Sequence, residues 1–155
     1  MGAGAETAWV PRLETTCDPA LRAAVEHQLQ RSNAERSPVL RALRASGEAD
    51  ERPLDVYALE GDELVGGLTG ATWARWLQVE LLWVHPDQRG AGLGGRLLAE
   101  AERIAREERG CVGARLETWG FQARPFYEAR GYAVFGVLED YPPGETEYHL
   151  AKRFA

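Results

Sequence analysis

The chain has 155 residues, of which 45% are hydrophobic and 27% are charged, and its formal net charge is -6. This length supports one hydrophobic core and leaves little room for a second, so we expect a single domain over residues 1–155. The acidic balance argues against nucleic-acid binding, and no apolar run approaches the roughly 20 residues of a membrane span. One soluble domain is the class that remains, and partners with positive charge fit its acidic balance better than nucleic acid does.

Cysteine usage predicts the compartment. The only two cysteines, Cys17 and Cys111, are far apart and lack the spacing of a zinc site or a disulfide framework. We therefore expect no metal and a reducing, cytoplasmic location. The start of the chain lacks the basic flank and apolar stretch of a signal peptide. The sequence leaves open whether the chain is a monomer or a homodimer.

The first third of the chain predicts one strand and two helices. Residues 1–6 are expected to fray, and residues 7–15 have the pattern of an edge strand. Asp18 stands before Pro19 as a helix N-cap stands before a proline at the first helical position. A second helix is expected to begin near residues 37–38.

The middle of the chain reads as three consecutive antiparallel strands. Residues 54–59 and 64–73 are apolar runs joined by a short turn of Gly and acidic residues, which is the pattern of a hairpin. Residues 76–84 form the third run, and we expect it to pair beside the hairpin.

Helices and strands alternate in the last part. The apolar residues of 91–109 fall on one helical stripe, and 111–118 should return as a strand parallel to the third run through a right-handed crossover. A short helix at 125–129 and strands at 132–138 and 145–154 follow. The expected fold is α+β with α/β/α layers, built on a mixed, mostly antiparallel sheet of six to seven strands with a parallel pair at its centre.

The turn before the long helix is rich in glycine and carries a cation. Arg89 precedes glycines at positions 90, 92, 94 and 95, and the helix begins inside them. Free backbone N–H groups and the positive end of the helix dipole make such a turn an anion site. The missing Cβ atoms let a pyrophosphate approach the backbone, and the guanidinium suits phosphate oxygens. We expect a ligand that carries phosphate.

Two interpretations of this turn compete. Gly90, Gly92 and Gly95 satisfy the dinucleotide fingerprint G-x-G-x-x-G, with Glu117 about 20 residues beyond as the acidic partner. However, residues 85–89 separate the strand from the glycines, and the chain lacks the further βαβ units of that fold.

The second interpretation rests on a family resemblance. Residues 84–94 read Val-x-Pro-x-x-Arg-Gly-x-Gly-Leu-Gly, which resembles the acetyl-coenzyme A (acetyl-CoA) loop of the GNAT N-acetyltransferases. Residues 123–132 resemble that family's Ala…Phe-Tyr-Glu-x-x-Gly-Tyr segment. The resemblance covers roughly residues 54 to 153 and implies the acyl-CoA N-acyltransferase (GNAT) fold, whose central parallel strands splay apart.

The resemblance implies acetyl-CoA as co-substrate and direct acetyl transfer to a primary amine of a small molecule or peptide, possibly a cationic one. The backbone of Leu82, Trp83 and Val84 would then bind the pantetheine arm, and Gln122 would replace the Asn that binds it in several relatives. The residues expected at the phosphates are those of the turn: Arg89, Gly90, Ala91, Gly92, Leu93, Gly94 and Gly95.

Three residues are candidates for acid–base work. The resemblance assigns Tyr127 to the group that protonates the leaving thiolate. Two carboxylates compete for the base: Glu117 at the end of the returning strand, which we favour slightly, and Glu80 inside an apolar run. His149 alternates with apolar neighbours in the last strand and is expected to be structural.

The acceptor is the least defined part of the prediction. Aromatic and acidic residues expected near the pocket could hold a cationic amine or could fill the core; they are Trp73, Trp76, Trp119, Tyr141, Glu139, Asp140 and Glu145. Two other functions stay open beside the enzyme: a non-catalytic module that senses acetyl-CoA, and the dinucleotide-binding domain.

Overall fold

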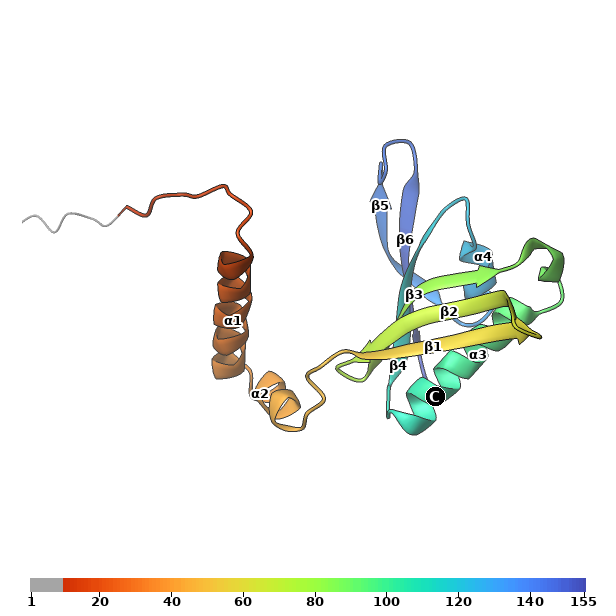
Figure 1. Ribbon diagram of the computed structural model, residues 1–155, viewed down its shortest axis with the longest axis horizontal. Coiled ribbons are helices and arrows are strands. Elements are labelled where there is room, and N and C mark those ends of the chain that lie inside the picture. Colours follow the sequence, from red (N-terminus) through yellow and green to blue (C-terminus); the bar gives the residue numbers. More distant parts are fainter. Residues whose placement is uncertain (1–9) are drawn as a thin grey trace, which may run out of the picture. The chain divides into compact units, whose positions relative to one another are not determined.

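A computed structural model describes residues 10–155, and the chain divides after Ala42 into two compact units (Figure 1). The elements in chain order are α1 Pro19–Arg36, α2 Pro38–Ala45, β1 Arg52–Glu60, β2 Glu63–Trp73, β3 Trp76–Val84, a 3-10 turn Pro86–Gln88, α3 Leu93–Arg103, a π-helical turn Ile104–Glu108, β4 Gly113–Trp119, α4 Arg124–Glu128, β5 Ala133–Glu139 and β6 Thr146–Arg153. Every helix and strand predicted from residue 18 onward is present.

The segment before α1 differs from the prediction. Residues 10–15 form no strand, and Val10 and Leu13 are more than four-fifths exposed. The predicted fraying at 1–6 and the first part of the predicted strand, 7–9, lie outside the described residues. The strand prediction is wrong for 10–15 because no ladder partner satisfies its backbone. The sheet therefore has six strands in the part of the chain that is described.

Helix α1 starts where the sequence predicted. The Asp18 carboxylate accepts hydrogen bonds from the backbone N–H groups of Ala20 and Leu21, at 2.8 and 3.0 Å. None of the residues of α1 is buried, although its apolar residues recur at helical spacing. No helix within residues 10–155 is long and apolar enough to cross a membrane.

The sheet has the order β1-β2-β3-β4-β6-β5, and β3–β4 is its one parallel pair (Figure 1). The crossover through α3 makes this pair parallel, as predicted. Strand β6 inserts between β4 and β5, so the last strand borders the centre of the sheet rather than its edge. The mixed, mostly antiparallel α+β architecture is confirmed.

The central pair separates after a short contact. Strands β3 and β4 pair only over Trp76–Val79 and Gly113–Leu116. On the other side of β3, Gly70 of β2 pairs with Val79 while Thr69 pairs with Leu81, so Glu80 is the extra residue of a β-bulge. The stretch 80–84 of β3 therefore has an edge that β4 does not cover. This separation is the splay that the family resemblance implies.

Gly70 makes this bulge possible. A Cβ atom at this position would overlap the backbone carbonyl oxygen of Gln78. Because a backbone atom cannot move aside as a flexible side chain can, only glycine fits where β2 approaches β3 this closely. The bulge beside the splay thus depends on a residue of the neighbouring strand.

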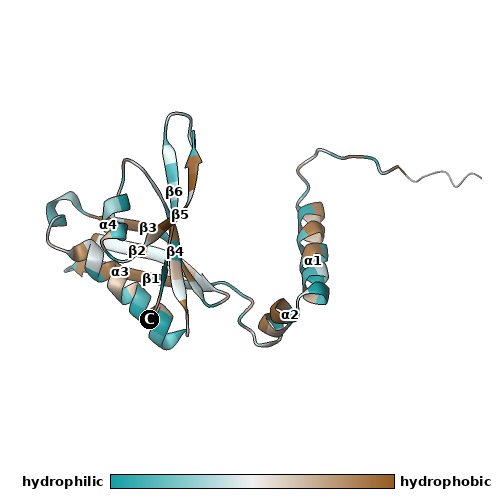
Figure 2. Ribbon diagram, turned by 180° about the vertical axis from the view of Figure 1, so that it is seen from behind, coloured by the Kyte–Doolittle hydropathy of each residue, from teal (hydrophilic) through white to brown (hydrophobic). Residues whose placement is uncertain are grey.

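Helix α3 covers one face of the sheet and forms the core with it. Leu97, Leu98 and Ala101 of α3 are at most 3% exposed. Its last turns are polar, as the colours of Figure 2 show. The largest fully buried side chains are Leu54, Leu68, Leu77, Leu98, Leu116 and Leu150. Each contributes roughly 1.5 to 3 kcal/mol by burial.

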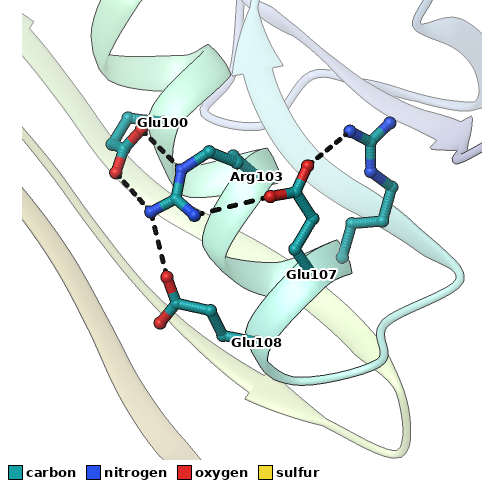
Figure 3. Close-up of polar contacts among 5 residues, drawn as sticks. Glu100, Arg103, Glu107 and Glu108 are labelled. Atoms are coloured by element: carbon teal, nitrogen blue, oxygen red, sulfur yellow. Dashed lines mark hydrogen bonds and ion pairs between the residues drawn. The ribbon is translucent and has the colours of Figure 1, made fainter.

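An exposed ion network marks the C-terminal end of α3 (Figure 3). The Arg103 guanidinium lies 2.7 Å from Glu100, 3.5 Å from Glu107 and 2.9 Å from Glu108. The hydrogen bonds that Arg103 donates to Glu100 and Glu108 raise the pKa of Arg103. The hydrogen bond from Arg103 lowers the pKa of Glu100, and the one from Arg106 lowers the pKa of Glu107. The network lies at the opposite end of α3 from the glycine turn.

Candidate active site

Helix α3 begins inside the glycine turn, at Leu93, two residues later than predicted. Its N-cap, Gly92, has a φ of 82°, a left-handed conformation that a side chain would strain. No side chain caps the helix, and the first bond of the ladder runs from Arg96 N to Gly92 O. The N–H groups of the first turn are therefore available to an anion.

A groove of about 510 Å³ lies along this turn. It is lined by Leu82, Val84, Gln88, Arg89, Gly90, Gly92, Leu93, Gly94, Gly95, Ala123, Phe126, Tyr127 and Arg130. Most of the predicted cofactor residues thus come together, whereas Trp83, Ala91 and Gln122 are not among the lining residues. No carboxylate lines the groove, and two guanidinium groups do.

The backbone holds Arg89 at the groove. Its Nε donates a hydrogen bond to the carbonyl oxygen of Val84, at 3.1 Å. This bond ties the guanidinium to the end of β3 and leaves its terminal nitrogens for other acceptors. Together with the free N–H groups of α3, it fits the groove to a phosphate-bearing ligand.

Arg130 is a second cation of the groove, which the sequence analysis missed. Its guanidinium carbon lies 3.7 Å from the centre of the Phe126 ring, and its Nη1 donates to the Phe126 carbonyl at 2.9 Å. The signal in the sequence is that this arginine stands directly before the glycine of the second motif, Gly131. This signal is weak by itself, because a basic residue at that place is also an ordinary feature of a helix C-terminus.

Tyr127 projects from α4 into the groove and is only 7% exposed. Its ring packs edge-on against Phe126 and Tyr132, with ring centres 5.0 and 5.8 Å away. Burial raises the pKa of this phenol, so its hydroxyl stays protonated at neutral pH. No hydrogen-bond partner of that hydroxyl is recorded within residues 10–155. It is an available donor.

Glu117 lies one residue beyond Leu116, the last residue of β4 that pairs with β3. Its side chain is on the face of the sheet opposite α3, because Leu116 and Thr118 on either side of it are buried. One carboxylate oxygen accepts a hydrogen bond from Gln78 Nε2 at 2.9 Å, and the other lies 3.7 Å from His149 Nδ1. Glu117 is therefore held at the start of the splay.

Glu80 occupies the bulge of β3, across the splay from β4. It is exposed, and no ion pair or hydrogen bond of its side chain is found in residues 10–155. Both predicted base candidates thus lie at the splay, and neither lines the groove that holds Tyr127. Tyr127 lies on the face of the sheet that α3 covers, and Glu117 lies on the opposite face.

Gln122 has a local partner. Its side-chain oxygen accepts hydrogen bonds from the Thr118 hydroxyl and from the backbone N–H of Trp119, both at 3.2 Å. The amide therefore holds the end of β4, and its contact with a pantetheine arm stays a prediction.

The predicted aromatic group divides in two. The Trp119 indole donates to the Tyr141 carbonyl at 2.8 Å and stacks on Phe121, with ring centres 5.8 Å apart. The indole of Trp73, the last residue of β2, instead donates to the Ala49 carbonyl, at the end of the sheet far from the glycine turn. Trp76 lies beneath Arg153 at that same end. Only the pair on β4 and the β5–β6 connection lies beyond the splay.

The dinucleotide interpretation is wrong on topology. That fold needs a series of parallel strands joined by helical crossovers, and here one parallel pair lies within an otherwise antiparallel sheet. The 3-10 turn Pro86–Gln88 also separates β3 from the glycines, so the strand does not enter the turn directly.

Comparisons with known proteins agree with this geometry. The Acetyltransferase (GNAT) family matches residues 18–132. The chain is 53% identical over 129 residues to a blasticidin-S acetyltransferase of Streptomyces morookaense, covering 81% of this chain and 95% of that one.

Two solved structures extend the similarity to the fold. An acetyltransferase of Bacillus cereus superposes with a TM-score of 0.79 at 26% identity, covering 92% of this chain and 98% of the other. A Bacillus anthracis protein assigned as a streptothricin acetyltransferase, solved with acetyl-CoA, superposes with a TM-score of 0.61 at 25% identity over 68% and 65% of the two chains.

Proposed function

This chain belongs to the GNAT acetyltransferase family, and from that premise we propose that it transfers the acetyl group of acetyl-CoA directly to a primary amine of a small molecule. The observation that carries the proposal is the groove at the uncapped start of α3, which opens beside the unpaired edge of β3. The family match spans both compact units, which supports one functional domain.

The residues of the groove fit acetyl-CoA. The N–H groups of the first turn of α3, Arg89 and Arg130 would bind the phosphates, and the edge of β3 at 82–84 would bind the pantetheine arm. When bound, the co-substrate supplies an acetyl thioester. Backbone N–H groups left unpaired at the splay would polarise its carbonyl.

The reaction needs an acid for the departing sulfur and a base for the acceptor amine, and the structure offers one on each face of the sheet. Tyr127 holds a proton on its hydroxyl and would donate it to the departing sulfur. Glu117, held by Gln78, would take the proton from the acceptor ammonium so that the neutral amine can attack. Glu80 is the competing carboxylate, because the bulge exposes it at the same gap.

We propose an amine-bearing antibiotic as the acceptor, and blasticidin S is the first to test. The support is the name of the relative that is 53% identical over 95% of its length. The carboxylates at the splay would suit an acceptor that is cationic before it reacts.

The test measures thiol release from acetyl-CoA in the presence of blasticidin S, a polyamine, an aminoglycoside and an amino acid, with the acetylated product identified by mass. Release that depends on one of these amines is the expected result. Binding of acetyl-CoA by calorimetry without release from any amine would favour the sensing module instead. Binding of neither would contradict the proposal.

A further inference from the structure

We propose that His149 and Glu147 of β6 form a proton relay behind Glu117, so that His149 receives the proton that Glu117 takes from the acceptor. The inference deepens the function proposed above and rests on it. It also replaces the sequence-based expectation that His149 is structural.

The first observation is the position of the imidazole. In the β4–β6 ladder His149 lies directly opposite Glu117, the first residue of β4 beyond its pairing with β3. The ring nitrogen Nδ1 lies 3.7 Å from the Glu117 carboxylate, and Nε2 lies 3.0 Å from that of Glu147. One imidazole therefore bridges two carboxylates at the start of the splay.

The second observation is the burial of Glu147. Its side chain is 15% exposed, against 37% for Glu117, and His149 is its one recorded charged partner in residues 10–155. A carboxylate that is this far buried is costly unless a cation compensates it. Glu147 therefore favours the imidazolium form of His149 at the moment that the ring receives a proton.

The charges around His149 come from few elements. On β4, Glu117 lies opposite the ring. Arg115 lies two residues before Glu117 on the same face and pairs with Ala151. From its own strand, His149 faces Glu147. From β3, the neutral Gln78 contacts Glu117 and not the ring itself. From β5, the centre of the Phe135 ring lies 6.0 Å from that of the imidazole. Glu117 and Glu147 are the titratable groups in contact with the ring.

The proton steps balance without another reactant. A proton leaves the acceptor ammonium for a Glu117 oxygen, and the electron pair of the broken N–H bond stays on the amine. Glu117 then passes that proton to His149 Nδ1 and regains its charge, and the imidazolium, 30% exposed, releases it to water. The 3.7 Å gap is closed by rotation of the carboxyl group or by one bridging water. His149 acts through Glu117 and is a positioning residue for it.

The experiment measures kcat and KM between pH 6 and 9 with the amine that supports release in the wild type. His149→Gln should lower kcat about 10- to 100-fold, within the range of general acid–base groups, with the KM for acetyl-CoA unchanged. In His149→Ala, added imidazole should restore part of the rate, which a purely structural role would not allow. His27→Gln, an exposed histidine of α1, is the matched control.

Glu147→Gln tests the relay without removing the ring. Without the negative charge 3.0 Å from Nε2, the ring is a poorer acceptor of the transferred proton, so kcat should fall several-fold while the KM for acetyl-CoA stays unchanged. If His149→Gln retains the wild-type kcat at every pH, or if imidazole restores nothing to a folded His149→Ala, the relay is wrong while the proposed function stands. If the wild type releases no thiol with any of the amines tested, the relay and the proposed function are both contradicted.

Discussion

At the gap between β3 and β4, the two faces of the sheet carry groups of opposite charge. On one side, the groove is lined by backbone N–H groups, Arg89 and Arg130, and no carboxylate reaches it. On the other side, Glu117, Glu147 and His149 lie on the face of the sheet that α3 does not cover. Under the proposed function, the phosphate-bearing co-substrate and a cationic acceptor would approach the same gap from separate faces of the sheet, which keeps each from binding in the other's place.

Loss of the Glu117 charge should have the largest effect on the rate. Glu117→Gln keeps the hydrogen-bonding shape but removes the charge, so kcat should fall roughly 100- to 10,000-fold, with little change in the KM for acetyl-CoA. Steady-state kinetics across pH measure this. Glu80→Gln is the matched variant. A large loss in Glu80→Gln with none in Glu117→Gln would transfer the role of base to the bulge.

Damage to the groove should act on the co-substrate alone. Arg89→Ala removes a charge-assisted contact, and Gly92→Val forces a side chain into a left-handed conformation. We expect the double variant to bind acetyl-CoA about 10- to 100-fold more weakly by calorimetry. Gly47→Val is the control, because its φ of 75° gives similar strain in a turn before β1 that does not line the groove. Equal losses in both variants would contradict a site at the turn.

The phenol should have a smaller effect. Tyr127→Phe removes the free hydroxyl but keeps the packing, and we expect kcat to fall about 10-fold. Since burial raises the pKa of Tyr127 above its ordinary value of 10.0, the proton is retained below that pH. The wild-type kcat should therefore show no fall between pH 7 and 9 that disappears in Tyr127→Phe. Such a fall would mean that the phenol titrates early.

The smallest change is expected at the second cation of the groove. Arg130→Gln keeps a polar side chain but loses the charge over the Phe126 ring. Affinity for acetyl-CoA should drop only a few-fold, because the remaining contacts at the turn persist. Titration at low and high salt separates this charge effect from a change in shape, since only the former weakens with ionic strength.

The structure brings together more of the residues predicted for the cofactor than of those predicted for the acceptor, and the reason is physical. The groove is made by neighbours in sequence, the glycine turn and the start of α3, so its residues form a local pattern. His149 meets Glu117 only because β6 inserts between β4 and β5, which is a long-range pairing that no local pattern reports. The sequence therefore predicted Glu117 and Glu80 as candidate bases and a structural role for His149.

The bulge shows the same limit. Glu80 attracted attention as an acidic residue in an apolar run, which is a local signal. Its exposure, however, depends on Gly70 of the neighbouring strand, whose hydrogen atom leaves room for the Gln78 carbonyl. The residue that makes room for the bulge thus lies on β2, away from both motifs. The strand predicted at 10–15 failed for a similar reason, since a ladder needs a partner that the pattern cannot supply.

The open edge of β3 also bears on self-association. An uncovered sheet edge ordinarily invites a strand from another chain, and long flat edges promote aggregation. Here the edge over 80–84 begins at a point where β3 and β4 are still hydrogen-bonded, at Val79 and Leu116. A second chain would have to fit a wedge that closes to normal strand spacing, whereas a thin flexible arm can enter from the wide end. The geometry that leaves the edge unpaired thereby also protects it from other polypeptides.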